Sequence, residues 1–188
     1  MRTLRLTALI SFCLASLSIL AAPIFLSDSY NPITNSISES AGQNVPFGWI
    51  GRTALLASGI GVLAVVALKR RGWSRITIFS FTAFGVLWIT TALFSTKSWV
   101  PNAEFNELES NLHSFAASAM AIVVLGALAE ALSRKALSKT DRTLAFGLAA
   151  AATFLPLASL LWPTYGGLFQ RLMFFFTYFW FARQALRS

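Results

Sequence analysis

The sequence predicts an all-α integral membrane protein, a bundle of six transmembrane helices with both termini in the cytoplasm. The chain of 188 residues is 56% hydrophobic and only 12% charged, which leaves too little polar surface to enclose its apolar residues in a soluble globule. Six apolar runs, each of about 20 residues and long enough to cross a bilayer core, are separated by short polar segments.

These runs give the expected helices in chain order within one domain, residues 1–188. The expected spans are residues 6–26, 49–68, 76–94, 114–132, 144–162 and 168–186, and the longest outer loop is residues 27–48. The first run also resembles a secretory signal peptide, whose removal would leave five helices with the other loops on the same sides. Leu20 and Pro23 flank the candidate cut after Ala22 and disfavour it, so we predict a retained span.

The distribution of basic residues gives the orientation. Of the 15 Lys and Arg residues, all but Arg52, Lys97 and Arg171 fall on the side of the N-terminus when six spans are threaded through the membrane. Short loops rich in Lys and Arg stay in the cytoplasm. The net charge of +8 therefore indicates topology and attraction to anionic lipid headgroups, and we expect no nucleic-acid partner.

The outer loop is dense in Ser, Asn, Pro and Gly, which disfavours a long helix there. Ile33 and Ile37 lie one helical turn apart within it, between Tyr30 and Phe47. This pattern predicts a short segment on the membrane surface or a lid packed over the helix ends.

Four short motifs occur along the chain in an order and spacing that point to a family. They are residues 30–32 (Tyr-Asn-Pro), residues 37–39 (Ile-Ser-Glu), His113 at the start of the fourth span, and residues 167–171 (Gly-Leu-Phe-Gln-Arg) at the start of the sixth. In this order the chain resembles the membrane protein family known as domain of unknown function 998, over nearly its whole length. The resemblance implies a six-helix protein of bacteria or archaea and brings no established activity. Lys97 stands where that family often has a carboxylate.

Three cations open apolar runs and form the core of the candidate site. With both termini inside, the second, fourth and sixth helices point their N-termini outward, and Arg52, His113 and Arg171 lie at those N-termini. A fixed cation there opposes the helix dipole, at a cost of roughly 0.3–1 kcal/mol at exposed positions. Three such placements require a compensating anion.

Two sources of that anion stay open. The internal source is Asp28, Glu39 and Glu109, the last of which lies one turn before His113 if the helix extends upstream. The external source is a lipid headgroup, phosphate or carboxylate bound at the helix N-termini. We predict that the three cations meet Glu39 in an outward-facing polar cluster. The family resemblance adds Tyr30, Asn31, Ser38 and Gln170 to the same rim.

Two further patterns concern helix packing. Small residues spaced for close helix contact occur in the second, fourth and fifth spans, at Gly59, Gly61 and Ala64, at Ala117 and Ala121, and at Gly147 and Ala151. We interpret all of them as contacts within the bundle. The sixth span is bulky on every side from Phe174 to Phe181, which predicts a position at the bundle edge, against lipid or a partner subunit.

Enzyme chemistry finds little support. One histidine and one cysteine, Cys13, which we expect to be a buried thiol, do not supply the usual ligands of a metal centre or a bis-histidine haem. No Gly-x-Ser-x-Gly elbow is present, and a dyad of His113 with a loop serine rests on composition alone. We expect no catalysis and no cofactor.

We therefore predict a multi-pass protein of the bacterial cytoplasmic (inner) membrane that binds a lipid headgroup or small anion. Membrane lipids are its expected partners. The alternatives are an accessory subunit, joined to a larger membrane complex through the aromatic sixth helix, and a small-solute transporter. Transport is the weaker alternative because Glu130, near the inner end of its span, is not the mid-membrane carboxylate that a proton-coupled carrier usually has.

Overall fold

The computed structural model describes residues 1–27, 29–100, 102–133 and 138–187, and these residues form helices and loops with no β-strand. The elements are α1 (Arg2–Phe25), α2 (Ile37–Ser40), α3 (Trp49–Lys69), α4 (Arg75–Leu93), α5 (Glu107–Ser133), α6 (Lys139–Leu161), the 3₁₀ turn η1 (Pro163–Tyr165) and α7 (Gly166–Leu186). The all-helical prediction is confirmed. Of the candidate anions, Asp28 lies outside the described residues.

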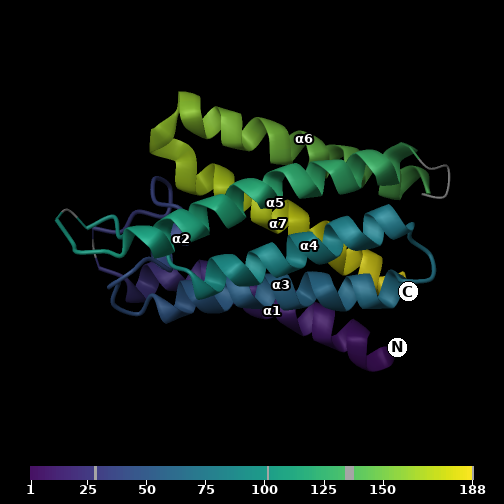
Figure 1. Cartoon of the computed structure of the whole chain (residues 1–188), viewed down its shortest axis with the longest axis horizontal. Helices are drawn as coiled ribbons and strands as arrows, with labels where there is room; N and C mark the ends of the chain where they lie inside the picture. Colours follow the sequence, from purple (N-terminus) through teal and green to yellow (C-terminus); the bar gives the residue numbers. More distant parts are fainter. Residues whose placement is uncertain (28, 101, 134–137, 188) are drawn as a thin grey trace.

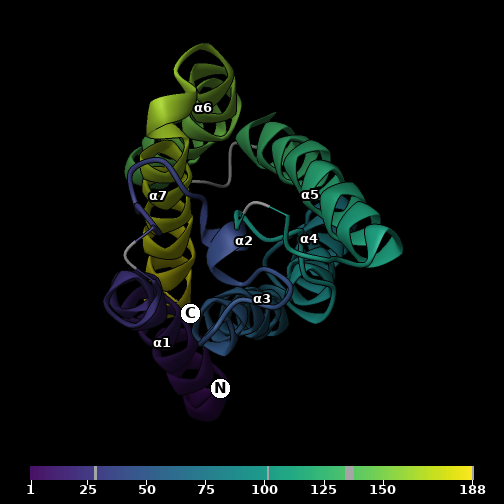
Figure 2. The same cartoon turned by 90° about the vertical axis from the view of Figure 1, so that its left-hand side faces the viewer.

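The six long helices form a ring in which each packs beside its neighbours in the chain (Figure 2). The ring closes where α7 contacts both α1 and α3. Both chain termini lie at one end of the bundle, which we call the terminal end, and α2 lies at the opposite loop end (Figure 1). The loop end carries the long connections, residues 26–48 and 94–106.

Five of the described helices are long and apolar enough to cross a membrane: α1, α3, α4, α5 and α6. The helix α7 does not meet the same hydropathy criterion, because Gln170, Arg171, Arg183 and Gln184 interrupt its apolar residues. The chain is thus a multi-pass membrane protein by the composition of its helices. The sixth span and the cytoplasmic termini stay predictions.

The fourth predicted span starts too late. The helix α5 begins at Glu107, seven residues before the predicted Ser114, so His113 lies in its second turn. The side chain of Asn106 accepts a hydrogen bond from the backbone N–H of Glu109 at 3.1 Å and caps the helix. Glu107 and Glu109 in the first turn also complement the helix dipole.

One face of the aromatic α7 packs into the bundle, where the predicted edge position is wrong, while Leu172, Phe176 and Phe179 on its other face are exposed. Phe174, Tyr178, Trp180 and Phe181 are at most 5% exposed. The hydroxyl groups of Tyr178 and Ser58 on α3 share a hydrogen bond of 2.5 Å. A helix that is bulky on every side can therefore pack one of its faces into the bundle.

Small residues pack closely in only part of the bundle. A Cβ added to Gly59 would lie 2.7 Å from the carbonyl oxygen of Gly85 on α4, and one added to Gly61 would lie 2.6 Å from the Phe12 ring on α1. The interpretation as helix contacts is therefore confirmed for these two. It is wrong for Gly147 on α6, where an added Cβ would meet no atom of another described helix or loop within 4 Å. Cys13, expected to be buried, is exposed on α1 because it lies on the side of that helix away from Phe12.

Candidate functional site

Arg171 is the hub of the loop end. It is 8% exposed and points from the second turn of α7 into the outer loop. Its guanidinium donates to the carbonyl oxygens of Pro32 at 2.6 Å and Asn35 at 2.8 Å, and to the hydroxyl of Tyr30 at 2.7 Å. Neutral oxygen atoms, not a carboxylate, therefore solvate this buried cation within the described part of the chain.

Tyr30 and Gln170 complete the attachment of the outer loop to α7. The buried Tyr30 hydroxyl donates to the carbonyl of Ser36 at 2.9 Å. Burial raises the pKa of Tyr30 above its ordinary value, against the opposing effect of the Arg171 charge, so the phenol stays protonated and can donate. The side-chain oxygen of Gln170 accepts from the backbone N–H of Ile37 at 2.5 Å.

Glu39 and Asn31 act within the outer loop. Glu39 accepts from the backbone N–H of Ser36 at 2.6 Å, while the Ser36 hydroxyl accepts from Glu39 N–H at 3.0 Å, and together these bonds form the capping box of α2. The exposed Asn31 folds its own turn by accepting from the N–H of Ile33 at 2.9 Å. Neither residue forms an ion pair with a cation among the described residues.

His113 fastens α5 to the end of α4. The ring is 3% exposed, and its Nδ1 lies 3.0 Å from the Thr91 carbonyl oxygen and 2.7 Å from that of Phe94. Because both neighbours are acceptors, Nδ1 carries the hydrogen. Glu109 binds Ser95, the residue after Phe94 at the end of α4, since its carboxylate accepts from the Ser95 N–H at 2.6 Å. The expected direct pairing of Glu109 with His113 is not found in the described chain.

Arg52, the third cation, is exposed and makes one long hydrogen bond, 3.4 Å, to the Ala41 carbonyl. Among described residues, no hydrogen bond or ion pair joins any two of Arg52, His113 and Arg171, or joins one of them to Glu39. In the described chain, the three side chains are therefore not joined to one another, and each instead forms hydrogen bonds with backbone carbonyl oxygens at the loop end. Whether these residues bind a ligand stays a prediction.

Two adjoining cavities lie at and below the loop end. The first, which we call the vestibule, is an open cavity of about 930 Å³ lined by Ser38, Glu39, Lys97 and His113 among others. It thus contains a cation, a carboxylate and the imidazole. Arg52 and Arg171 do not line it.

The second cavity, which we call the chamber, lies within the helices and measures about 360 Å³. Its walls are mostly apolar and include Phe84, Ala121, Val124 and Phe174. Ser38, Ala117 and Ser118 line both cavities, so the chamber adjoins the vestibule. Ala117 and Ala121, which the sequence pattern assigned to helix contacts, therefore border a space.

Polar groups in the chamber are few and partly unpaired. Trp88 lines it and is 2% exposed, and its Nε1–H has no acceptor among the described residues. Pro156 also lines the chamber, and because proline has no N–H, the carbonyl of Ala152 loses its helical partner. A buried donor without an acceptor costs about 1–3 kcal/mol.

Sequence reasoning missed Trp88 and Gln43. Gln43 joins three segments, donating to the Ser95 and Asn106 carbonyls at 2.9 and 3.0 Å and accepting from Asn106 N–H at 2.7 Å. Nothing in its sequence context marks that role. Trp88 could have been found, because tryptophan usually lies at the ends of a span and this one lies inside it.

The described residues contain no group of three or more His, Cys, Asp or Glu side chains placed to hold a metal ion. No curated protein and no solved structure matches the chain. One family model does match, over residues 9–187, with the description "Protein of unknown function (DUF998)". The match covers nearly the whole chain and confirms the resemblance seen in the motifs of the outer loop, α5 and α7. The chain belongs to the DUF998 family.

Proposed function

We propose that this protein binds a membrane amphiphile, with its polar head in the vestibule and an acyl chain in the chamber, and performs no catalysis of its own. In this proposal the chain lies in the cytoplasmic membrane of a bacterium with both termini inside. The loop end then faces outward, and the ligand enters from the outer leaflet.

The observation that carries the proposal is the junction of two unlike cavities at Ser38, Ala117 and Ser118. An open polar space above a mostly apolar one has the polarity profile of a lipid. A pocket of this size, apolar with a few placed polar groups, is typical of small-molecule sites.

The unpaired Nε1–H of Trp88 supports the same assignment. Its Nε1 is enclosed in this arrangement, so an ester carbonyl at the junction of headgroup and acyl chain would accept from it after a turn of the indole toward the chamber. In the vestibule, Lys97 offers a cation to a phosphate or carboxylate, and His113 offers its ring edge. Arg171 and Tyr30 support the site from outside by holding the loop that carries Ser38 and Glu39.

The test is the lipid that stays bound after gentle detergent extraction, measured by native mass spectrometry. The substitution Ala121→Phe fills part of the chamber. If the larger ring excludes only two methylene groups of the acyl chain, retention falls about tenfold. The matched control is Ala129→Phe on the same helix, at an exposed position that does not line the chamber.

Equal lipid retention by wild type, Ala121→Phe and Ala129→Phe would exclude the chamber as a lipid site. Thermal unfolding of the three proteins in detergent shows whether the comparison is between folded proteins. A lipid-free protein that instead copurifies with a larger complex favours the accessory-subunit alternative. The exposed stripe of α7, Leu172, Phe176 and Phe179, is then the surface to alter.

A further inference from the structure

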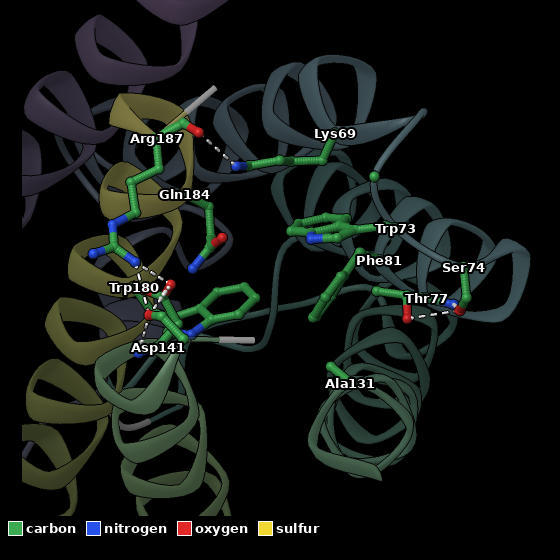
Figure 3. Close-up of a pocket in the computed structure, with 12 residues that line it drawn as sticks. Lys69, Trp73, Ser74, Thr77, Phe81, Ala131, Asp141, Trp180, Gln184 and Arg187 are labelled. Atoms are coloured by element: carbon green, nitrogen blue, oxygen red, sulfur yellow. Dashed lines mark hydrogen bonds and ion pairs between the residues drawn. The ribbon is translucent and has the colours of Figure 1, made fainter. Parts of the chain in front are cut away.

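A separate cavity of about 350 Å³ lies at the terminal end, far along the bundle from the vestibule (Figure 3). It is bordered by the turn between α3 and α4, the first turn of α6 and the last two turns of α7. We call it the terminal pocket. Neither the family motifs nor the proposed amphiphile site uses any of its residues.

One wall of the terminal pocket is aromatic. The rings of Trp73 and Trp180 are stacked, with centroids 6.1 Å apart and an angle of 20°, and Phe81 lies 5.1 and 5.4 Å from them. Trp180 is 2% exposed, and its Nε1–H has no acceptor among the described residues. The wall therefore offers apolar aromatic surface to the pocket, while the Trp180 Nε1–H itself is enclosed by packed atoms.

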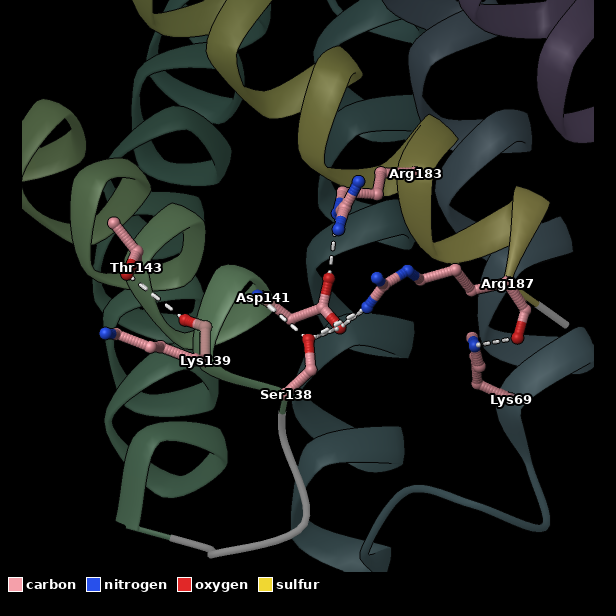
Figure 4. Close-up of polar contacts among 7 residues, drawn as sticks. All are labelled: Lys69, Ser138, Lys139, Asp141, Thr143, Arg183 and Arg187. Carbon is pink, nitrogen blue, oxygen red and sulfur yellow. Dashed lines mark hydrogen bonds and ion pairs between the residues drawn. The ribbon is translucent and has the colours of Figure 1, made fainter.

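The rest of the lining carries an excess of positive charge. Asp141 pairs with Arg183 at 2.9 Å and with Arg187, and it also accepts from the Ser138 hydroxyl at 2.7 Å (Figure 4). The Lys69 Nζ donates to the Arg187 carbonyl at 3.2 Å, and no ion pair of Lys69 is found among the described residues, although the charge of Asp141 acts on it. Among the described residues, the lining thus holds one carboxylate, Asp141, and two cations, Lys69 and Arg187, with Arg183 as a third cation beside Asp141 outside the lining.

The second carboxylate nearby does not remove this excess. Glu130 lies at the α4 edge of the pocket, where the hydroxyls of Ser74, at 2.7 Å, and Thr77 donate to it. With Glu130 included, three cations still face two carboxylates. This excess of positive charge among the described residues favours an oxyanion, which forms charge-assisted hydrogen bonds with a partly buried cation such as Lys69.

We propose that the terminal pocket binds a phosphate group between Lys69 and Arg187, with the attached organic part against Trp73 and Trp180. Two sources share this chemistry. One is the headgroup of an anionic phospholipid in the leaflet at the terminal end, where aromatic and basic side chains commonly contact headgroups. The other is a soluble phosphate compound.

The experiment uses the full chain and two arms. In the lipid arm, the protein is reconstituted in mixed phosphatidylglycerol and phosphatidylcholine bilayers, and native mass spectrometry measures the bound phosphatidylglycerol. In the soluble arm, inorganic phosphate is titrated into detergent-purified protein, and the shift in melting temperature is measured. The variants are Lys69→Gln and Arg187→Gln, and the matched control is Arg71→Gln, an exposed cation of the same turn that does not line the pocket.

We expect Lys69→Gln and Arg187→Gln each to weaken binding about tenfold in one arm, because each removes a charge-assisted donor. Arg71→Gln should change it by less than about twofold, since it acts only through screened surface charge. The arm that responds identifies the source. If all three variants behave alike in both arms, or neither arm detects binding, the terminal pocket is not a phosphate site. Ala121→Phe should leave this binding unchanged, which separates it from the proposed amphiphile site.

Discussion

The helices α3 and α6 are of similar length and similarly rich in small residues, yet they have opposite surroundings. In the most apolar stretch of 18 residues, 67% of the residues are buried in α3, against 17% in α6. A Cβ on Gly59 of α3 would meet the neighbouring backbone, while a Cβ on Gly147 of α6, which is exposed, would meet no atom of another described segment within 4 Å. The bundle thus has a closed side, α1, α3, α4 and α7, and an open side, α5 and α6.

This difference shows that a pattern of small residues has two uses in one membrane protein. On the closed side it lets α3 approach the backbone of α4 at Gly59 and the Phe12 ring of α1 at Gly61. On the open side it leaves space beside a cavity. The chamber lies where the two sides meet, so we assign rigidity to one side and ligand access to the other.

The largest expected effect concerns the attachment of the outer loop to α7 through Arg171, on the closed side. Arg171→Met removes the donor to Pro32, Asn35 and Tyr30, and we expect a loss of about 2–4 kcal/mol of stability and release of the outer loop. Cleavage after Glu39 by a glutamate-specific protease measures that release. Arg52→Met, which removes one bond of 3.4 Å, should protect the loop as well as wild type does. Equal cleavage of both variants would contradict the claim that Arg171 holds the outer loop on α7.

The next effect tests the packing contrast itself. Gly59→Ala forces α3 and α4 apart and should cost about 2 kcal/mol, as overpacking in cores does. Gly147→Ala meets no atom and should leave stability unchanged or raise it by up to about 1 kcal/mol through helix propensity. Thermal unfolding in detergent measures both. A Gly147→Ala protein as unstable as Gly59→Ala would show that the open side is packed.

The smallest effect concerns the hydrogen bond of His113 on α5 with the end of α4, where the open and closed sides meet. His113→Leu leaves the Phe94 carbonyl without its donor and should cost about 1 kcal/mol. His113→Asn can place an N–H near the position of Nδ1 and should recover part of that loss. Hydrogen exchange of residues 94–106 reports the change locally. If Leu and Asn at this position give the same exchange, the imidazole does not fasten this turn.

Apolar runs and basic loops were enough to predict the helices, because bilayer thickness and backbone hydrogen bonding leave few alternatives. The starts of α5 and α6 were misjudged because Asn106 and Ser138 cap them upstream of the apolar residues. The site was predicted less well. Arg171 does contact Tyr30, and Gln170 binds the same outer loop at Ile37, but the other partners of Arg171 are backbone carbonyls, which every residue has and no sequence pattern marks.

The cavities could not be predicted from the sequence. Trp88 and Trp180 look alike as residues inside apolar runs, and only the packing shows that each borders a space and that neither Nε1–H has an acceptor in the described part of the chain. Ala121 and Ala64 likewise occupy similar contexts, although one lines the chamber and the other is buried in the core. Empty volume depends on how far helices separate, which residue spacing does not encode.

The most direct test of the amphiphile site uses Trp88 as a reporter. Phospholipids with brominated acyl chains quench an indole that they contact, and the difference between wild type and Trp88→Phe isolates the Trp88 signal from the other tryptophans. After bulk brominated lipid is exchanged for detergent, our account predicts that Trp88 stays quenched in wild type and recovers in Ala121→Phe. Full recovery in both proteins upon exchange would contradict it.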